Sequence, residues 1–421
     1  MPSLTNKSYR VAFILITSLF FLWGFAHNLD PILIPHLKKS FTLTTTQSTL
    51  VDSSVFIAYF LMALPAGFIM KKYGYKVGII SGLLLFAAGS FLFIPAANTQ
   101  QYNFFLVALF IIACGLTILE TVANPYVSAL GDPETATQRL NLSQSFNGLA
   151  VALAPAIGAR IILTKGYAEA DLNAMTESAR KIALASEASS VKMPYLILGS
   201  VLVLFAVLFA FVKLPTIQNT EVHVSGKNIF HAFKHRHLSW AVAAQFFYVG
   251  AQVCVLSLFI LYATKSAGIS QVDAADFLGA GGIAFLTGRF LGTFLMKYIL
   301  PQRLLALYAG INILLCVVAI SAHGMITVYA VIGICFFMSI MFPTIFSLGI
   351  QGLKGDTAYG SSLIIMSIVG GAVLPPIYGI ISDATNNIQI GFIVPLVCFV
   401  VVLFFGLKGY KVMPNKNPVI N

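Results

Sequence analysis

The sequence predicts an all-α integral membrane protein with twelve transmembrane helices in two pseudo-symmetric six-helix bundles. Composition is the first observation: 58% of the 421 residues are hydrophobic and only 9% are charged, whereas soluble domains carry about 25% charged residues. Length is the second, because the apolar runs reach the roughly 20 residues that a helix needs to cross a bilayer. Repetition is the third, because short motifs recur in the same order in both halves of the chain.

Twelve apolar runs meet the length requirement for a transmembrane helix. They lie at approximately 10–36, 47–70, 77–97, 102–131, 139–163, 193–213, 238–263, 272–298, 302–322, 326–352, 358–381 and 388–408. The polar stretch 164–192 is interpreted as a long external loop, and the basic stretch 214–237 as a cytoplasmic linker. The predicted domains are therefore an N-terminal six-helix bundle (1–213), the linker (214–237) and a C-terminal six-helix bundle (238–421).

The distribution of Lys and Arg predicts the orientation. With both termini in the cytoplasm, 17 of these residues lie on the cytoplasmic side and 8 outside, and Arg139 and Arg289 are counted among the 17. Cytoplasmic segments of membrane proteins are enriched in Lys and Arg. The net charge of +11 is explained in this way, and no nucleic-acid partner is expected.

Four motif pairs indicate an internal repeat. The pairs are Gly24 in "WGFAHN" with Gly250 in "VGAQ", Gly67 in "GFIMKKY" with Gly292 in "GTFLMKY", Pro125 in "NPYVSALG" with Pro343 in "FPTIFSLG", and Pro155 in "APAIG" with Pro376 in "PPIYG". Their offsets of 226, 225, 218 and 221 residues are nearly equal. Parallel repeats of this kind are typical of transporters that alternate between outward and inward access.

The loop "GFIMKKYGYK" after the second span resembles the Gly-x-x-x-Asp-Arg-x-Gly-Arg-Lys loop of the major facilitator superfamily, although Lys71 stands where that pattern has Asp. The motifs "LFFLWGFAHNLDPILIPHLKKSF", "LETVANPYV", "RLNLSQSFN" and "AQFFYVGAQ" resemble the fucose/glucose/galactose permease branch of the superfamily. The resemblance extends over nearly the whole chain. It implies a sugar transporter in a bacterial inner membrane that uses an ion gradient.

The same resemblance implies roles for three polar residues. The carboxylate of the branch's "LETAANP" motif aligns with Glu120 in "LETVANP", and its fifth-span Gln and Asn align with Gln144 and Asn147. These positions imply proton coupling or sugar recognition.

Two acids depart from the pattern. The first-span Asp of the branch aligns with Pro31 rather than Asp30, and Asp52 stands where the branch has Gln.

The residues alone support a polar pathway through the first half. Thr117, Glu120 and Asn124 lie at i, i+3 and i+7, so they form one stripe on a helix. Ionisable groups within a membrane are costly, and they usually face a cavity or a partner. Burial disfavours the charged form of a carboxylate, so Glu120 can take up a proton near neutral pH. A structural hydrogen bond to a neighbouring helix is the alternative role.

The two further acids fall toward the outer half of their spans. Asp30 and Asp52 can share a proton or attract a cation. The alternatives are a helix-end role for Asp30 and an N-terminal capping role for Asp52. His27 lies one turn from Asp30 and can hydrogen-bond to it, with a packing role as the alternative, and Asn28 adds an amide to the same run.

A second polar stripe is expected in the second half. Gln245, Tyr248 and Gln252 repeat the i, i+3, i+7 spacing in the seventh span. Amides and hydroxyls can bind sugar hydroxyls, and Trp23, Phe56 and Tyr59 can cover the apolar face of a sugar or pack between helices. Gln144, Asn147, Gln245 and Gln252 are expected to line one cavity.

The leading hypothesis is import of a monosaccharide of the fucose, galactose or glucose type by proton symport. The alternatives are sodium-coupled sugar symport, a multidrug–proton antiporter, a non-transporting sugar receptor and a membrane-embedded enzyme. The sequence contains no P-loop and no GxSxG or HExxH motif, so neither ATP-driven transport nor enzymatic activity is expected. The expected partners are a monosaccharide and the lipid bilayer. No cofactor or metal is expected, and the protein is expected to function as a monomer.

Overall fold

The computed structural model describes residues 7–27, 41, 50–162, 174–215, 232 and 234–412, and every regular element in these ranges is helical. The earlier helices are α1 (Lys7–His27), α4 (Leu50–Thr99), α5 (Tyr102–Ala129), η1 (Pro133–Thr135), α6 (Ala136–Ile162), α8 (Glu177–Ser189) and α9 (Lys192–Phe211). The later helices are α10 (Arg236–Ser257), α11 (Phe259–Ala267), α12 (Gln271–Leu295), α13 (Pro301–Ser321), α14 (Met325–Met338), α15 (Met341–Ile350), η3 (Lys354–Asp356), α16 (Thr357–Met366), η4 (Ser367–Val369), α17 (Gly370–Thr385), η5 (Ile390–Phe392), α18 (Ile393–Phe404) and η6 (Phe405–Gly409).

The described helices correspond to the twelve predicted spans. Ten segments are long and apolar enough to cross a membrane. One of them, Ser54–Thr99, has 46 residues and bends at Gly74, where φ is 81°, so it contains the second and third predicted spans. α6 is also long enough, with 27 residues, and corresponds to the fifth predicted span, although it is not among these ten segments of the described residues. Counting Ser54–Thr99 twice and adding α6 gives twelve.

One helix was not predicted. α8 occupies 13 residues of the stretch interpreted as a polar loop, 164–192. Its sequence, "ESARKIALASEAS", consists mostly of strong helix formers. It packs on α4 and buries Ala183 while Ile182 is exposed. The hydropathy pattern misses this helix because α8 is too polar to resemble a span.

The chain forms two compact units. The N-terminal unit contains residues 10–123 and 146–215, and the C-terminal unit contains residues 1–9, 124–145 and 216–421. Stretch 124–145, which ends α5 and begins α6, thus packs with the helices of the second half of the sequence. The domain boundaries at 213 and 238 stay a prediction.

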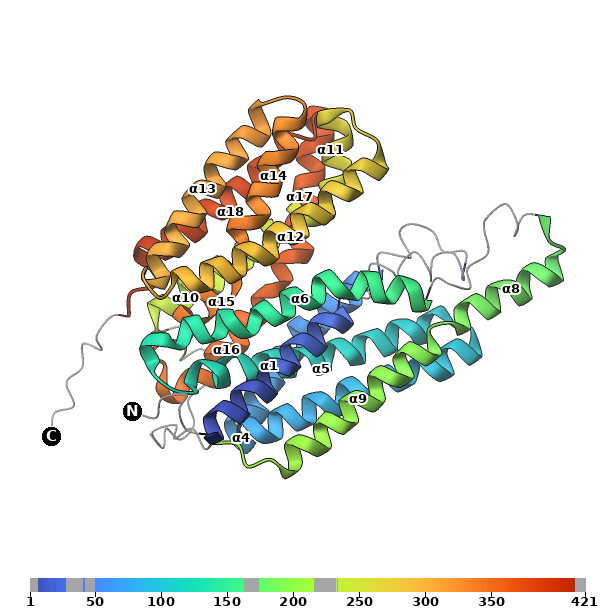
Figure 1. The fold of residues 1–421 in the computed structure, drawn as a ribbon, viewed down its shortest axis with the longest axis horizontal. Helices are drawn as coiled ribbons and strands as arrows, with labels where there is room; N and C mark the ends of the chain where they lie inside the picture. The colour runs from blue at the N-terminus through green and yellow to red at the C-terminus, as the bar shows by residue number, and fades with distance from the viewer. Residues whose placement is uncertain are drawn as a thin grey trace. The chain divides into compact units, whose positions relative to one another are not determined.

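In the N-terminal unit, α4 and α9 lie side by side (Figure 1). The rings of Phe93 and Tyr195 stack with their centroids 3.7 Å apart. Gly199 permits the close approach, since a Cβ there would fall 2.6 Å from the ring of Phe91. Lys76 closes the end of α9, because its Nζ donates hydrogen bonds to the carbonyl oxygens of Ala210 and Val212 at 2.8 and 3.1 Å.

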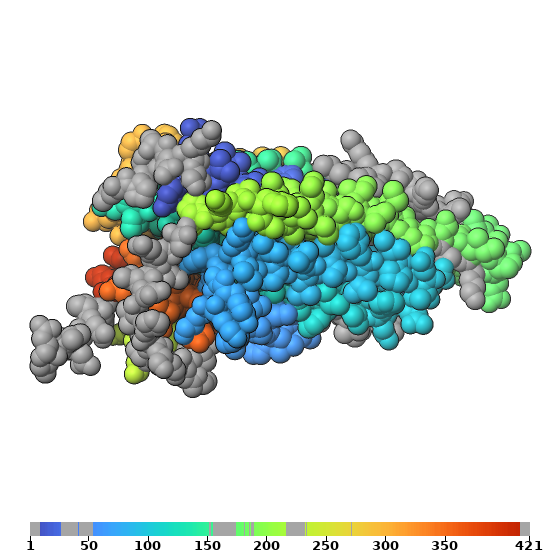
Figure 2. Space-filling view, turned by 90° about the horizontal axis from the view of Figure 1, so that it is seen from below, coloured from blue at the N-terminus to red at the C-terminus, as the bar shows by residue number. Residues whose placement is uncertain are grey.

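The outer face of this unit is apolar. Figure 2 shows α4 and α9 forming one continuous surface. Large hydrophobic side chains on it are exposed, among them Phe68, Ile197, Leu204 and Phe211. An exposed apolar area of this extent is typical of a surface in contact with lipid.

In the C-terminal unit, α10 is the central helix. It contacts α15, α16, α17 and α18. α17 begins against the backbone of α10, since a Cβ on Gly370 would lie only 2.1 Å from the carbonyl oxygen of Phe246. Substitution of Gly370 is therefore expected to separate these two helices.

The predicted span 326–352 is divided into α14 and α15 by a break at Ser339 and Ile340. Pro343 explains the break, because proline has no N–H to donate to the carbonyl four residues earlier. The carbonyl oxygen of Ser339 therefore lacks its usual partner within the helix. This free carbonyl becomes important for the site described below.

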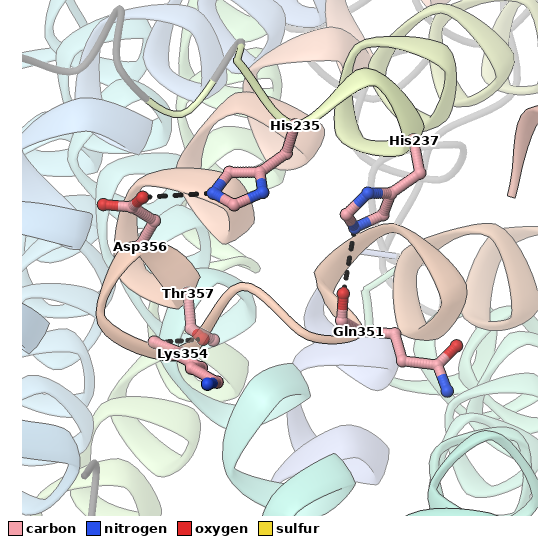
Figure 3. Close-up of polar contacts among 6 residues, drawn as sticks. All are labelled: His235, His237, Gln351, Lys354, Asp356 and Thr357. Carbon is pink, nitrogen blue, oxygen red and sulfur yellow. Dashed lines mark hydrogen bonds and ion pairs between the residues drawn. The ribbon is translucent and has the colours of Figure 1, made fainter. Parts of the chain in front are cut away.

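Two histidines at the start of α10 hold the segment between α15 and α16 (Figure 3). His235 Nε2 lies 3.2 Å from Asp356 Oδ2. His237 Nε2 lies 2.9 Å from the carbonyl oxygen of Gln351. The segment itself turns through Gly352 and Lys354, both of which have positive φ. The histidines thus fix the turn that precedes α16.

Candidate functional site

The carboxylate of Glu120 is held between helices of the N-terminal unit. The hydroxyl of Tyr59 on α4 donates a hydrogen bond of 2.9 Å to Glu120 Oε1 on α5. Tyr59 is only 4% exposed. Thr117, in the same predicted stripe, donates to the carbonyl oxygen of Ala113 in its own helix. Glu120 therefore binds a neighbouring helix, whereas Thr117 binds only its own. Tyr59 was expected to present its ring to a sugar, but here it is buried and its hydroxyl binds Glu120.

Asn147 on α6 contacts α1 in the same unit. Its Nδ2 donates to the carbonyl oxygen of Phe20 at 3.3 Å. Gly24 makes room for it, since a Cβ at Gly24 would lie 2.7 Å from that Nδ2 atom. Trp23, predicted to cover a sugar, is 2% exposed and packs on Phe20 with ring centroids 4.1 Å apart. In this structure Trp23 is part of the packed core beside Asn147.

We predict that Gly24→Ala displaces Asn147. The new methyl group overlaps both the side-chain amide and the backbone of Asn147, and overpacking of this kind costs about 1–3 kcal/mol. The temperature of thermal unfolding in detergent and the affinity for sugar should both fall. Gly310→Ala is the matched control, because no heavy atom lies within 4 Å of its Cβ position and alanine favours a helix over glycine by about 1 kcal/mol. Equal effects of the two substitutions would contradict this prediction.

A second polar pair lies in the C-terminal unit. Gln144 Nε2 on α6 donates to Asn124 Oδ1 on α5 at 3.3 Å. Gln144 is 5% exposed and Asn124 is fully buried. Asn124 Nδ2 has no hydrogen-bond partner within the described part of the chain. A buried donor without a partner is costly, so this pair has unused capacity to bind a polar ligand.

The predicted stripe on α10 is only partly reproduced. Gln245 and Tyr248 are fully buried, whereas Gln252 is partly exposed. Neither amide atom of Gln245 has a hydrogen-bond partner among the described residues. Leaving an amide buried in this way costs about 1–3 kcal/mol. Gln245 therefore also has unused capacity for hydrogen bonding.

Arg289 is a functional candidate that the sequence analysis missed. It was counted as a cytoplasmic residue, but it is 4% exposed inside α12. Its Nε donates to the carbonyl oxygen of Ser339 at 2.8 Å and its Nη1 to that of Gln144 at 2.7 Å. The guanidinium lies 4.5 Å from the ring centroid of Phe285. A lone arginine in an apolar run was the available signal, and a charge count does not show whether such a residue is buried.

Arg139 was assigned to the same count and is also buried, with 5% exposure. It donates hydrogen bonds to the carbonyl oxygens of Asp132 and Ser128. These contacts close the turn that leads from α5 to α6. Burial does not decide the side of the membrane, so the count of 17 basic residues against 8 and the orientation that it predicts are unchanged.

For four other predicted site residues, the position of the side chain is not described. Asn28 and Asp30 lie outside the described residues, and so do the side chains of His27 and Asp52. Their predicted roles stay predictions. Phe56, the third aromatic candidate, is partly exposed on α4.

Comparison with known proteins gives the family. Residues 11–354 match the model of the Major Facilitator Superfamily, which is well over half of the chain. The chain belongs to the major facilitator superfamily. The family expected from the motifs is therefore confirmed, and with it an all-α, multi-pass protein of the bacterial inner membrane.

Several proteins of the superfamily are similar over almost the full length. A glucose/galactose transporter of Brucella abortus is 42% identical over 97% of this chain and 96% of its own. The L-fucose-proton symporter of Escherichia coli is 41% identical over 95% and 93%. A crystal structure of the E. coli fucose:proton symporter matches with a TM-score of 0.88 and 40% identity, covering 95% of this chain and 98% of that one.

A further solved superfamily structure fixes the fold class. It is a Major Facilitator Superfamily transporter, FucP, in the outward conformation, and it matches with a TM-score of 0.89 and 41% identity over 95% of this chain and 99% of its own. At this identity and coverage the two proteins share their fold. The predicted fold class is confirmed.

Proposed function

We propose that the protein is a secondary active transporter that imports a monosaccharide by proton symport through alternating access. The observation that carries the proposal is the Glu120–Tyr59 pair, a carboxylate held inside a helical bundle of the superfamily. Similar proteins named as a fucose-proton symporter and as glucose/galactose transporters support both the substrate class and the coupling ion. No enzymatic activity is proposed.

Glu120 is the proposed proton carrier. A carboxylate between α4 and α5 is removed from bulk water, and protonation relieves the cost of its charge there. The hydroxyl of Tyr59 can donate to the charged form and keeps the carboxylate in one orientation. Asp30 and Asp52 are the proposed additional coupling acids.

The proposed sugar ligands are neutral polar groups. Asn124 and Gln245 are buried amides with incomplete hydrogen bonding, and Gln144 donates to Asn124. Sugar hydroxyls can supply the missing partners. Sites for small molecules combine an apolar lining with a few convergent polar groups. The other proposed sugar-binding residues are Asn147, Tyr248, Gln252, His27, Asn28 and Trp23.

Uptake by the purified protein in proteoliposomes tests the function. Radiolabelled fucose, galactose and glucose are offered in turn with an imposed proton gradient, an imposed sodium gradient or neither. We expect accumulation of at least one sugar with the proton gradient. Accumulation with sodium alone would favour the sodium-coupled alternative, for which Asp30 and Asp52 supply candidate carboxylates. No accumulation of any sugar would refute the proposal.

Asn147→Ala is expected to weaken sugar binding by about 5- to 150-fold, because a site that loses a hydrogen-bonding group to a polar ligand loses about 1–3 kcal/mol. Equilibrium binding of the transported sugar to the purified protein measures the effect. Asn103→Ala is the control, since Asn103 is exposed at the start of α5. Unchanged affinity in Asn147→Ala would remove Asn147 from the proposed sugar ligands.

The proposed topology places both termini in the cytoplasm and treats the monomer as the functional unit. The excess of basic residues on that side, 17 against 8, supports the orientation. Under this orientation the turn between α5 and α6 and the turn between α15 and α16 both lie at the cytoplasmic end.

A further inference from the structure

The buried guanidinium of Arg289 has no counter-charge in the described part of the chain. Its partners are neutral: the carbonyl oxygens of Ser339 and Gln144 accept its hydrogen bonds, and the ring of Phe285 lies beside it. No Asp or Glu among the described residues forms an ion pair with it. Removing a charge from water is costly unless an opposite charge compensates for it. An anionic ligand beside Arg289 is therefore stabilised more than a neutral one.

Arg289 lies on a face of α12 that differs from both the exposed face and the face packed on α14. The exposed face includes Ile283. The packed face includes Gly288, where a Cβ would lie only 2.3 Å from a backbone oxygen of α14. Gly282, Phe285 and Arg289 share a third face, because they are spaced at i, i+3 and i+7. A Cβ on Gly282 would meet no heavy atom within 4 Å, so this face has open space two turns from Arg289.

Tyr248 on α10 adds a hydroxyl near the guanidinium. The charge of Arg289 acts on the Tyr248 side chain, and the hydroxyl is fully buried with no hydrogen bond of regular geometry to the described residues. It approaches the backbone of Phe342 in the first turn of α15, a helix whose start has no side-chain cap. The N-terminus of a helix favours negative charge. The cation, the hydroxyl and the start of α15 thus favour an anion in the same place.

The other unpaired groups near Arg289 separate into two kinds. Gln144 connects Arg289 to Asn124, since its carbonyl accepts from the first and its amide donates to the second. Asn124 then has an unpaired donor, whereas Gln245, one turn from Tyr248, has an unpaired donor and an unpaired acceptor among the described residues. A hydroxyl both donates and accepts, so it suits Gln245, whereas a carboxylate only accepts, so it suits Asn124 and Arg289.

We propose that Arg289 is the centre of a carboxylate subsite, and that the preferred substrate is an acidic monosaccharide of the uronate class, which carries ring hydroxyls and one carboxylate. This inference rests on the proposed function and narrows its substrate class. All the residues that carry it belong to the C-terminal unit. Two of the five N–H donors of Arg289 bind carbonyl oxygens, which leaves three for a carboxylate. A neutral sugar satisfies donors there but supplies no opposite charge.

Three sugars that differ only at the sixth carbon test the proposal. D-Fucose carries a methyl group there, D-galactose a hydroxymethyl group and D-galacturonate a carboxylate that is ionised near neutral pH. Equilibrium binding of each to the purified protein measures the preference. We expect galacturonate to bind about 10- to 150-fold more tightly than galactose, as for a hydrogen bond to a charged partner. Equal or weaker binding of galacturonate would overturn the proposal.

Substitution of Arg289 tests the origin of the preference. Arg289→Gln keeps a polar side chain without the charge, so the ratio of galacturonate affinity to galactose affinity should fall to about one. Arg289→Lys keeps a charge on a different geometry and should keep part of the preference. The ratio is measured within each variant, so damage that affects both sugars equally cancels. An unchanged ratio in Arg289→Gln would show that the arginine has only a structural role.

Arg139→Gln is the matched control. Arg139 is also buried, with 5% exposure, and also donates to backbone carbonyls, those of Asp132 and Ser128. It belongs to the turn between α5 and α6, so its loss should leave the ratio of the two affinities unchanged. Equal loss of the preference in Arg139→Gln and Arg289→Gln would contradict a specific subsite at Arg289.

Small anions distinguish a sugar subsite from a general anion site. Acetate carries the same carboxylate without the sugar ring, and we expect it to displace bound galacturonate at least tenfold less effectively than unlabelled galacturonate does. Chloride should behave in the same way as acetate. Displacement by either anion as effective as that by galacturonate would overturn the assignment of an acidic sugar.

The outcomes separate this inference from the proposed function, because binding is measured without transport. Preferred binding of galacturonate by a protein that accumulates no sugar would refute only the proposed function. Proton-driven accumulation of a neutral sugar, together with equal affinity for galactose and galacturonate, would refute only the carboxylate subsite. The comparison of the three sugars uses the unmodified protein, so it remains decisive if the arginine variants do not fold.

Discussion

Glu120→Gln is expected to abolish proton-driven accumulation. At a membrane potential of 100 mV, one proton supplies about 2.3 kcal/mol, which allows a concentration ratio of about 50-fold. Glutamine can still accept the hydrogen bond of Tyr59, but it cannot carry a proton, so the ratio should fall to about one. Steady-state uptake in proteoliposomes measures this ratio.

Asp30→Asn provides the comparison. If Asp30 is needed only for ion-driven movement, this variant should lose accumulation and keep exchange of labelled for unlabelled sugar. Glu120→Gln should in addition change sugar affinity and its dependence on pH. Full accumulation by Asp30→Asn would show that its acid is structural, and loss of coupling in Asp52→Asn alone would assign the role to the second span.

Gln245→Leu is expected to stabilise the protein and impair its function. The substitution removes a fully buried amide whose two polar atoms lack partners among the described residues. Its removal should raise the free energy of unfolding by about 1–3 kcal/mol. Sugar affinity should fall at least tenfold, because a sugar hydroxyl is the proposed partner of this amide. Thermal unfolding and sugar binding, measured on the same preparation, test both effects.

Gln389→Leu is the matched control for the sign of the stability change. The Gln389 amide is also buried, but it donates to the carbonyl oxygens of Ala319 and Ala322 at 2.9 and 2.8 Å. The same substitution there removes both hydrogen bonds, although the carbonyl oxygen of Ala319 still accepts one from the hydroxyl of Tyr262 at 2.7 Å, and it should destabilise the protein. If Gln245→Leu also destabilises the protein, the amide of Gln245 has a structural role and the prediction is wrong.

The helices were predictable because the membrane imposes a simple rule. α5 runs from Tyr102 to Ala129 and α9 from Lys192 to Phe211, within a few residues of the predicted spans 102–131 and 193–213. Apolar runs of fixed length are needed wherever a helix meets lipid. α8 was missed because that rule does not apply to a polar helix.

The contacts within the site were less predictable. The periodicity placed Glu120 on an inward face but could not select Tyr59 as its partner, because the partner comes from a helix 61 residues away in sequence. Likewise, a count of basic residues treats Arg289 in the same way as an arginine in an exposed loop. Its burial depends on two carbonyl oxygens and the ring of Phe285, and no sequence pattern brings these together.

The lysine that closes α9 also relates the protein to the thickness of its membrane. The 20 residues of α9 span about 30 Å, which is close to the hydrocarbon thickness of a typical bilayer. Because Lys76 binds the carbonyls at one end of this helix, a charged group marks that boundary of the hydrocarbon layer. A thinner or thicker bilayer must therefore be accommodated by tilt of α9 or by movement at its Lys192 end, at a cost of a fraction of a kcal/mol for each ångström of mismatch.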